Sequence, residues 1–357
     1  MNTGIGKVIT LGSVAALALG VCLYWLLLAA PGGESATRTF ILPLGTPPET
    51  ALAELERQGH IKSAWAFGLV HSARVAPGAY RLASDMDAFT VARRLAAEPQ
   101  MKWVVIPEGW RKEQIAELLA ATLDWSEREK LDWLTVATAR NREEIEGVYF
   151  PDTYLIPADE DAEQVAKRLR ARFHEKFAPH AEEALKQNIK WTSLLTIASL
   201  IQREAAGKAD MPLIAGILWN RLLQDHKLDV DATVQYARDT DQSYGIEPCG
   251  TPADPARPAA ATDCDGAALA PAAGAYLGMA AWWAPITIDD KRNDSRFNTY
   301  RHRKLPPHPI ANPGLAAIEA ALFPQKTECF YYLHAPNGDI HCAATYPEHL
   351  NNIERFL

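Results

Sequence analysis

The clearest feature of the hydrophobic pattern is an uncharged, apolar run at residues 8–29. A membrane-spanning helix needs about 20 apolar residues, whereas the hydrophobic region of a signal peptide takes roughly 7 to 15. The length predicts a single-pass transmembrane helix, although Ala29 and Ala30 would also suit a signal-peptide cleavage site. Lys7 precedes the run, so we expect residues 1–7 in the cytoplasm and the rest of the chain across the membrane.

Short strand and helix patterns follow a polar spacer at residues 30–39 and predict an α+β fold. The stretches FILPLGTPPETALAEL and VVIPEGWRKEQIAELL each have the pattern of a strand, a Pro-x-Gly turn and a helix. Pro and Gly favour the turn, and Glu49 or Glu113 favours the start of the helix. Two similar strand-turn-helix units are therefore expected in the N-terminal region 40–145. The alternative is that the similarity between the two stretches is a coincidence.

Longer helices characterise the region 146–357, which we predict to be a second, helix-rich domain with short strands. Residues 160–190 are heavily charged with a sparse apolar stripe, which indicates a solvent-exposed pair of helices. The segment 191–238 is more apolar, and the region from Phe297 onward mixes turns and short strands.

The composition excludes some classes of protein. The chain has 357 residues, of which 48% are hydrophobic and 22% charged, so it is expected to bury a core and to form two or more folded units. Its 36 Lys and Arg residues against 44 Asp and Glu residues give a net charge of -8, without the basic surplus that binding to a phosphate backbone needs. Nucleic acid is therefore not expected as a partner.

The cysteines matter if the chain enters an oxidising compartment. Cys249 and Cys264 flank a loop rich in Pro and Ala, and such a compartment favours a disulfide that closes this loop. No CxxC or HExxH spacing occurs, so no metal site is expected.

Cys329 and Cys342, in contrast, are predicted to stay unpaired. The Asn-Gly dipeptide at 337–338 suits a two-residue hairpin turn, which would set Cys342 opposite Leu333. Cys329 would then lie about four residues further along the strand, roughly 13 Å away and beyond disulfide reach.

The helical stretch WTSLLTIASLIQREAAG contains the strongest candidate for catalysis. Leu200, Ile201 and Glu204 recur at the spacing of one helix face, so the carboxylate points toward the core with the aliphatic side chains. Loss of water around a carboxyl raises its pKa, which keeps a glutamic acid protonated at neutral pH and able to act as a general acid. A buried structural Glu204, paired for example with Arg221, is the alternative.

Several blocks, in order along the chain, resemble one family. They are IPEGW at 106–110, EGVYFPDTY at 146–154, ASLIQREA followed by IAGILWNRLLQDHKLDVDATVQYA, FNTYRHRKLPPHPIANPG at 297–314, and a terminal segment with Gly338, His341 and His349. Through these blocks, nearly the whole chain after the spacer resembles the YceG-like (MltG) family of endolytic murein transglycosylases.

The resemblance implies a bacterial enzyme that one helix holds in the inner membrane, with its catalytic domain, 146–357, in the periplasm. It implies endolytic cleavage of nascent peptidoglycan glycan strands between N-acetylmuramic acid and N-acetylglucosamine. Such cleavage leaves 1,6-anhydro ends and terminates strand elongation. No metal and no organic cofactor are implied, and peptidoglycan synthases in the same membrane are the suggested partners.

The resemblance also implies a single catalytic glutamate within ASLIQREA. Many relatives have two glutamates there, whereas this chain has Gln202 at the first position and Glu204 at the second. We assign catalysis to Glu204, because it is the carboxylate present and helical spacing turns it inward. One carboxyl is sufficient if the substrate's own C6 hydroxyl attacks C1, whereas a hydrolase usually needs a second carboxylate.

Other residues in the matching blocks are expected to shape a substrate cleft with groups that suit sugars. The candidates are Glu146, Asp152, Tyr154, Asn220, Arg221, Asp231, Thr233, Tyr236, Asn298, Thr299 and Tyr300. Asp152 would equally serve to cap a turn, and Arg221 would either orient Glu204 or bind an acetamido or lactyl group. The segment that begins at Ile106 resembles a LysM-like glycan-binding module, for which a purely structural role is the alternative.

Two other functions compete with the transglycosylase. Gln202 suggests a membrane-anchored protein that binds peptidoglycan without cleaving it. A muramidase would use a second carboxylate, Glu146 or Asp231, to activate water, and its products would have reducing muramic acid ends.

Overall fold

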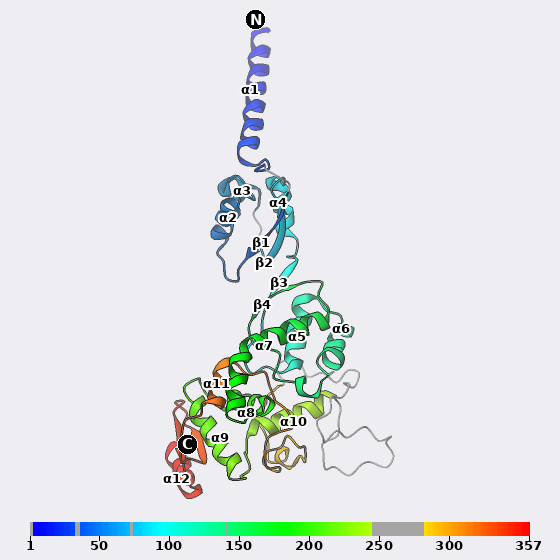
Figure 1. Cartoon of the computed structure of the whole chain (residues 1–357). Helices are drawn as coiled ribbons and strands as arrows, with labels where there is room; N and C mark the ends of the chain where they lie inside the picture. Colours follow the sequence, from blue (N-terminus) through cyan, green and yellow to red (C-terminus); the bar gives the residue numbers. More distant parts are fainter. Residues whose placement is uncertain (1–2, 33–35, 72–73, 140, 245–281) are drawn as a thin grey trace. The chain divides into compact units, whose positions relative to one another are not determined.

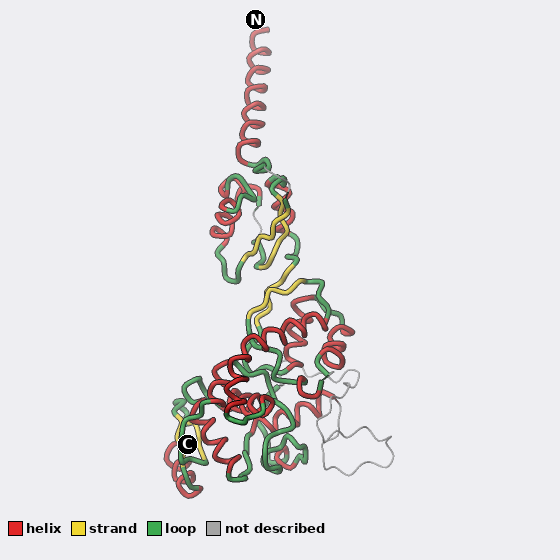
Figure 2. The backbone as a smooth tube through the Cα atoms, viewed as in Figure 1, coloured by secondary structure: helices red, strands yellow, loops and turns green. Residues whose placement is uncertain are grey.

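The computed structural model of the chain describes residues 3–32, 36–71, 74–139, 141–244 and 282–357 (Figure 1). The chain divides into two compact units, each made of two segments. The first comprises Met1–Val104 and Tyr154–Glu160, and the second comprises Val105–Thr153 and Asp161–Leu357. Helices and strands occur in both units (Figure 2), so the predicted α+β fold is confirmed.

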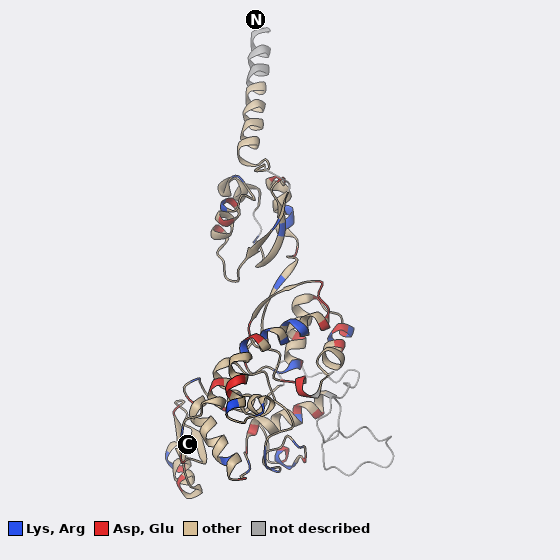
Figure 3. Ribbon diagram, in the orientation of Figure 1, with Lys and Arg blue, Asp and Glu red and all other residues tan. Residues whose placement is uncertain are grey.

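The first unit begins with helix α1, Thr3–Leu27, which covers most of the apolar run. Its described side chains are mostly apolar and exposed, for example Leu17 at 70% and Trp25 at 65%, and none from residue 13 onward is charged (Figure 3). Within the described ranges, no helix is both long and apolar enough to span a membrane. Tyr24, near the end of α1, donates a hydrogen bond of 3.3 Å to Asp87 Oδ2.

A four-stranded sheet with the order β1-β2-β3-β4 forms the centre of the first unit. Its strands are β1 (Thr37–Leu42), β2 (Gly78–Ala83), β3 (Met101–Val105) and β4 (Thr153–Pro157). β1 and β2 pair antiparallel, with Phe40 opposite Tyr80. Between them lie α2 (Pro48–Arg57) and α3 (Ala64–Val70), and α4 (Ala88–Ala96) follows β2.

The core of this unit forms where the inward positions of the strands meet the apolar faces of the helices. Phe40, Tyr80, Leu55 of α2 and Phe67 of α3 are fully buried together. Strands β1 and β2 and helices α2 and α3, within residues 37–83, therefore share one hydrophobic core. The segment from Ile106, where we expected a LysM-like module, belongs to the second unit.

Helices dominate the second unit. They are α5 (Lys112–Leu123), α6 (Glu127–Asp132), α7 (Ala162–Lys186), α8 (Trp191–Glu204), α9 (Met211–Leu223), α10 (Asp231–Tyr244), α11 (Leu315–Leu322) and α12 (Tyr346–Phe356). A hairpin of β5 (Tyr331–His334) and β6 (Ile340–Ala343) precedes α12. Both strand-turn-helix segments predicted from the sequence are confirmed, as β1 with α2 and β3 with α5.

The charged region that we expected to form two helices is one helix, α7, which continues through Pro179. Phe173 and Phe177 lie on its buried face just before the proline. Tertiary packing of this face outweighs the single backbone hydrogen bond that a proline removes.

Helix α8 lies at the centre of the second unit and packs against α7, α9, α10 and α11. Every residue from Leu194 to Ile201 is buried, as expected for a helix that is surrounded by others. The helix ends at Glu204, because Ala205 has an extended backbone. This central, buried helix therefore ends on a carboxylate.

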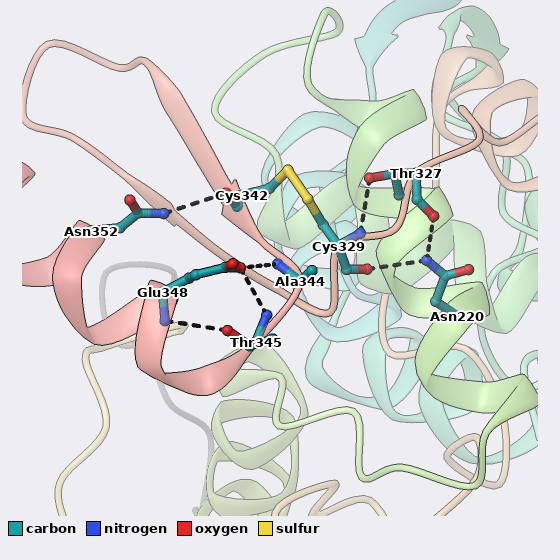
Figure 4. Close-up of a disulfide and its surroundings, with 8 residues drawn as sticks. All are labelled: Asn220, Thr327, Cys329, Cys342, Ala344, Thr345, Glu348 and Asn352. Atoms are coloured by element: carbon teal, nitrogen blue, oxygen red, sulfur yellow. Dashed lines mark hydrogen bonds between the residues drawn. A yellow bond between two sulfur atoms is a disulfide. The ribbon is translucent and has the colours of Figure 1, made fainter.

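A disulfide joins Cys329 to Cys342, so the prediction that these cysteines stay unpaired is wrong (Figure 4). Residues 335–339 form a longer turn than the assumed two-residue turn, and Cys342 therefore lies opposite Tyr332. Cys329 also precedes β5 instead of extending it, and its Cα lies 5.8 Å from that of Cys342, within disulfide reach. The predicted pair Cys249–Cys264 lies outside the described residues.

Candidate active site

A cleft of about 670 Å³ opens in the second unit at the point where α8 ends. Its walls come from the end of α8, the start of α10, the β5-β6 hairpin and α12. The predicted site residues that line it are Glu204, Arg221, Asp231 and Tyr300. Residues far apart in the sequence therefore meet at the carboxylate that helical spacing had singled out.

The Glu204 carboxyl lies in the wall of this cleft and is partly exposed. Tyr332 donates a hydrogen bond of 2.5 Å from its hydroxyl to Oε2, and the backbone N–H of Ala232 donates a second bond to the carboxyl. Ala232 belongs to the first turn of α10, and the N-terminus of a helix favours a negative charge. The carboxyl is thus held by two donors from different elements.

The pKa of Glu204 is raised above its ordinary value, chiefly because the surrounding protein removes water from the carboxyl. The negative charge of Asp231 raises it further, while the bonds from Tyr332 and Ala232 and the charge of His334 act in the opposite direction. Glu204 therefore keeps its proton to a higher pH than an exposed glutamate, which is what a general acid requires.

Asp231 and Tyr300 form a second polar pair in the cleft. Tyr300 donates a hydrogen bond of 2.5 Å to Asp231 Oδ1, and the Lys291 ammonium lies 3.6 Å from the same oxygen. Lys291 Nζ also lies 3.9 Å from the centre of the Tyr300 ring. The carboxylate and the ring are thus oriented by one another and by a shared cation.

Arg221 lines the cleft, but backbone carbonyls occupy much of its guanidinium. Nε donates to Phe330 O at 2.6 Å, and Nη1 donates to Leu228 O at 2.5 Å and lies 3.3 Å from Asp229 Oδ2. In the described part of the chain, no hydrogen bond or ion pair joins Arg221 to Glu204. Arg221 therefore ties the loop before α10 to the hairpin, and it is not the buried partner of Glu204 that we considered.

Several predicted residues support the cleft walls from behind. Thr299 Oγ1 accepts a hydrogen bond from Val230 N at 3.0 Å and lies 3.0 Å from Thr233 Oγ1. Asn298 Oδ1 accepts from Tyr300 N at 3.0 Å. Because Thr233, Asn298 and Thr299 are fully buried, their role in the free protein is to hold the Tyr300 loop against the start of α10.

Two further candidates lie outside the cleft lining. Asn220 donates from Nδ2 to Thr327 O at 2.8 Å and to Cys329 O at 3.1 Å, which ties α9 to the segment before β5. Tyr154 lies on β4 in the first unit and is buried.

Asp152 and Tyr236 also have structural partners. Asp152 accepts from Thr153 N at 2.8 Å and from Arg172 Nε at 2.7 Å, which is the turn-capping arrangement considered as its alternative role. Tyr236 is buried, and its ring centre lies 4.1 Å from the guanidinium carbon of Arg111.

Glu146 is fully buried in a polar cluster at the start of α5. Its carboxyl accepts from Lys112 N at 3.2 Å and from Asn312 Nδ2 at 2.6 Å. Burial, followed by the charge of Glu113, raises the pKa of Glu146 to about 8. Glu146 does not line the cleft, so its contacts support a capping role.

Gln202 has a different environment from Glu204. Its Oε1 accepts from Gly314 N at 3.0 Å, which ties α8 to the start of α11. Residues two positions apart lie on different faces of a helix. The glutamine therefore does not stand in the position from which Glu204 reaches the cleft.

Sequence reasoning missed the residues that the C-terminal segment brings to the cleft. Tyr331 and Tyr332 of β5 line it with Tyr346 and His349 of α12. The rings of Tyr331 and His349 stack with their centres 5.4 Å apart. Adjacent tyrosines were visible in the sequence, but helical or strand periodicity alone could not show which of them would reach Glu204.

The cleft combines a protonatable carboxyl with tyrosine rings, a carboxylate and guanidinium groups. Aromatic faces and fixed polar groups suit a hydroxyl-rich ligand, and the carboxyl can move a proton to or from it. Among the described residues, no group of His, Cys, Asp or Glu could hold a metal ion.

Comparison with known proteins identifies the family of this chain. The model of the YceG-like family matches residues 40–355. The chain belongs to the YceG-like family. The matched range contains Glu204 and every residue that lines the cleft.

Similar proteins extend the comparison. An endolytic murein transglycosylase of Bacillus subtilis is 27% identical over 342 residues, which cover 88% of this chain and 84% of the relative. A protein of the same name from Streptococcus pneumoniae is 24% identical over 87% of this chain and 57% of the relative. The crystal structure of a YceG-like protein from Listeria monocytogenes shares the fold, with a TM-score of 0.55 and 24% identity over 89% of this chain and 99% of that one.

Replacing Tyr332 by phenylalanine is expected to raise the pKa of Glu204 further, because a hydroxyl that stabilises the ionised carboxyl is lost. A ¹³C NMR titration of the Glu204 carboxyl would show its midpoint moving to higher pH. Tyr331→Phe is the matched control, since Tyr331 lines the cleft without a bond to Glu204. An unchanged midpoint in Tyr332→Phe, or an equal shift in the control, would contradict the assigned role.

Replacing Glu146 by glutamine is expected to change how stability depends on pH. Between the ordinary value near 4.5 and the folded value of about 8, the folded state keeps a proton on Glu146 that the unfolded state has lost. Wild type therefore loses stability as pH rises through this window, by on the order of 4 kcal/mol, and the variant lacks this loss. Urea unfolding of both proteins at pH 5 and pH 8 measures the difference, and parallel stability curves would disprove it.

Proposed function

We propose that this chain is an endolytic lytic transglycosylase of peptidoglycan, with Glu204 as its catalytic acid and base. The observation that carries the proposal is the protonatable Glu204 carboxyl in the cleft of a YceG-like chain, held by Tyr332 and Ala232. Relatives that are similar over most of this chain bear the name endolytic murein transglycosylase. The bond cleaved lies between N-acetylmuramic acid and N-acetylglucosamine in nascent glycan strands.

The reaction needs two proton transfers and no water. Glu204 first donates its proton to the glycosidic oxygen as the bond from that oxygen to C1 of muramic acid breaks. The leaving N-acetylglucosamine gains a hydroxyl, and Glu204 becomes a carboxylate. The C6 hydroxyl of the same muramic acid then attacks C1, and its proton returns to Glu204. The products are a 1,6-anhydro end and the starting acid, so the strand stops growing at that end.

The groups around Glu204 serve both halves of this cycle. Burial and the charge of Asp231 both raise the pKa of the carboxyl and so favour the protonated form that the first step needs. The Tyr332 hydroxyl and the Ala232 N–H bond to the carboxylate that forms after the first transfer. Since both donors are in place in the free protein, no reorganisation is needed when the charge develops.

The water-using muramidase remains the second candidate, because the cleft contains two other carboxylates, those of Asp229 and Asp231. Asp231 lines the cleft, but it accepts from Tyr300 and lies 3.6 Å from Lys291. Glu146, the other residue considered for this role, is buried outside the cleft lining. Activation of water would require one of these carboxylates to act opposite Glu204.

We propose further that the apolar segment 8–29 anchors the enzyme in the inner membrane, with the second unit in the periplasm beside peptidoglycan synthases. Exposed apolar side chains on α1, such as Leu17 and Leu19, support an anchor. The Cys329–Cys342 disulfide supports an oxidising compartment. LysM-like binding of glycan stays a proposal for the segment that begins at Ile106, on the resemblance of that segment alone.

Digestion of purified peptidoglycan, analysed by mass spectrometry, tests the reaction. Wild type is expected to release fragments with 1,6-anhydro ends from within strands. Glu204→Gln keeps the shape of the side chain without its proton, and it is expected to lower the rate by at least about 1000-fold. Glu127→Gln, at a glutamate whose side chain is 86% exposed, is the matched control and should retain wild-type activity.

Each competing function gives a different product. Reducing muramic acid ends that carry oxygen from labelled water would identify a muramidase and contradict the transglycosylase. Binding of glycan without products from either wild type or Glu204→Gln would identify an inactive binding protein.

Cell fractionation tests the proposed location. The full chain is expected in the membrane fraction and to be released only by detergent, whereas a variant without residues 1–29 should be soluble. Mass spectrometry of the nonreduced protein is expected to find Cys329 joined to Cys342. Recovery of the full chain in the soluble fraction, or free thiols at these two positions, would count against an anchored periplasmic enzyme.

A further inference from the structure

Within the part of the chain that the structure describes, one arginine in the cleft wall has no partner for its N–H groups. Arg203 precedes Glu204 on α8 and lines the cleft. Among the described residues its guanidinium makes no hydrogen bond or ion pair, and its Nε is buried without an acceptor. Burial of such a cation is unfavourable unless a partner is supplied. Arg203 interacts electrostatically with the nearby Glu204 carboxyl, but that carboxyl already accepts hydrogen bonds from Tyr332 and Ala232.

An aromatic platform holds Arg203 in place. The guanidinium carbon lies 4.1 Å from the centre of the Trp283 ring. A cation over an aromatic face gains electrostatic attraction while its in-plane N–H groups stay available for another ligand. The contact therefore fixes the arginine without using its hydrogen-bonding capacity.

Trp283 is itself fixed from several sides. Its backbone N donates to Asp239 Oδ2 at 2.8 Å, and its indole Nε1 donates to Gln114 Oε1 at 3.1 Å. Its carbonyl accepts from Gln235 Nε2 at 3.0 Å. Its φ of 66° is a left-handed conformation that bulky residues rarely adopt, and strain of this kind is typical of functional sites. The position of the Trp283 ring beside Arg203 is thus fixed by the hydrogen bonds of the protein itself.

The other cleft residues do not offer the same group. The Nε and Nη1 of Arg221 donate to backbone carbonyls, as described above, and Asp229 lies 3.3 Å from Nη1. Asp231 accepts from Tyr300. In the described lining of the cleft, Arg203 is therefore the guanidinium with no hydrogen bond or ion pair of its own, whereas Arg221 is fixed through its Nε and Nη1.

We propose that Arg203, stacked on Trp283, is a binding site for a carboxylate of the glycan strand. This inference rests on the proposed function and names the group by which the cleft recognises its substrate. The sugar backbone is uncharged, and its carboxylates belong to the lactyl group of muramic acid or to the attached peptide stem. The planar fork of an arginine binds a carboxylate through two parallel hydrogen bonds, which orient the ligand. Because Arg203 adjoins Glu204, this contact orients the muramic acid beside the acid that cleaves its bond.

Binding measurements in the Glu204→Gln background, where strands bind without turnover, test the inference by calorimetry. The three ligands are naked strands with free lactyl carboxylates, peptide-substituted strands whose lactyl group is amidated, and chitooligosaccharides without a carboxylate. Arg203→Met is expected to weaken binding about tenfold for the carboxylate ligands and less than about twofold for chitooligosaccharides. Arg203→Lys keeps the charge without the planar fork and is expected to lose about threefold. Arg292→Met, at an arginine whose side chain is 76% exposed, is the matched control and should bind all three ligands as before.

The pattern of losses decides the source of the carboxylate. A loss confined to naked strands assigns the lactyl group, and a loss confined to substituted strands assigns the peptide stem. An equal loss for all three ligands, or no loss for any, would overturn the inference. Failure of wild type to produce 1,6-anhydro ends would overturn the proposed function instead, since carboxylate-dependent binding is measured without cleavage.

Discussion

The proposed chemistry of the second unit depends on the position of one carboxyl, that of Glu204. The protein shields this carboxyl from water, and two hydrogen-bond donors, Tyr332 and Ala232, bind it. Loss of water can raise the pKa of a carboxyl by several units, whereas a hydrogen bond to the charged form contributes about 1.5 to 3 kcal/mol, or roughly one to two units. Burial therefore prevails, and the pKa of Glu204 is raised. The two donors act against that rise, because they stabilise the ionised carboxyl. A more deeply buried acid would hold its proton too tightly, and a solvated one would lose it too early.

The rest of the unit positions those donors. Tyr332 comes from β5, whose hairpin is tied by the Cys329–Cys342 disulfide and by the bond from Arg221 to Phe330 O. The start of α10 is held by buried hydroxyl contacts to the loop that carries Tyr300. Many polar residues in the blocks that resemble the family therefore bind the protein's own backbone. They determine where a few other side chains lie.

The sequence revealed what depends on local periodicity. The spacing of Leu200, Ile201 and Glu204 is a property of one helix, and it placed the carboxylate on the correct face. The donors could not be found in this way, because Tyr332 meets Glu204 only through the pairing of segments far apart in the chain. The same reason explains the missed disulfide, since a change in turn length altered which residue faces Cys342. Buried candidates such as Glu146 were predicted to bind substrate because a carboxylate can accept hydrogen bonds from sugar hydroxyls. A carboxylate that caps a helix accepts hydrogen bonds in the same way, so the residue type alone could not distinguish the two roles.

The sheet of the first unit has a consequence for how such a chain can change during evolution. Its fourth strand, β4, comes from residues 153–157, after the chain has already built α5 and α6 of the second unit. A break at Val104 would remove β1, β2 and most of β3 and leave β4 with an unpaired edge, which favours aggregation. The two units are therefore interleaved in the gene and cannot be exchanged by a single recombination event. An exchange of one unit would require the chain to be joined at more than one point.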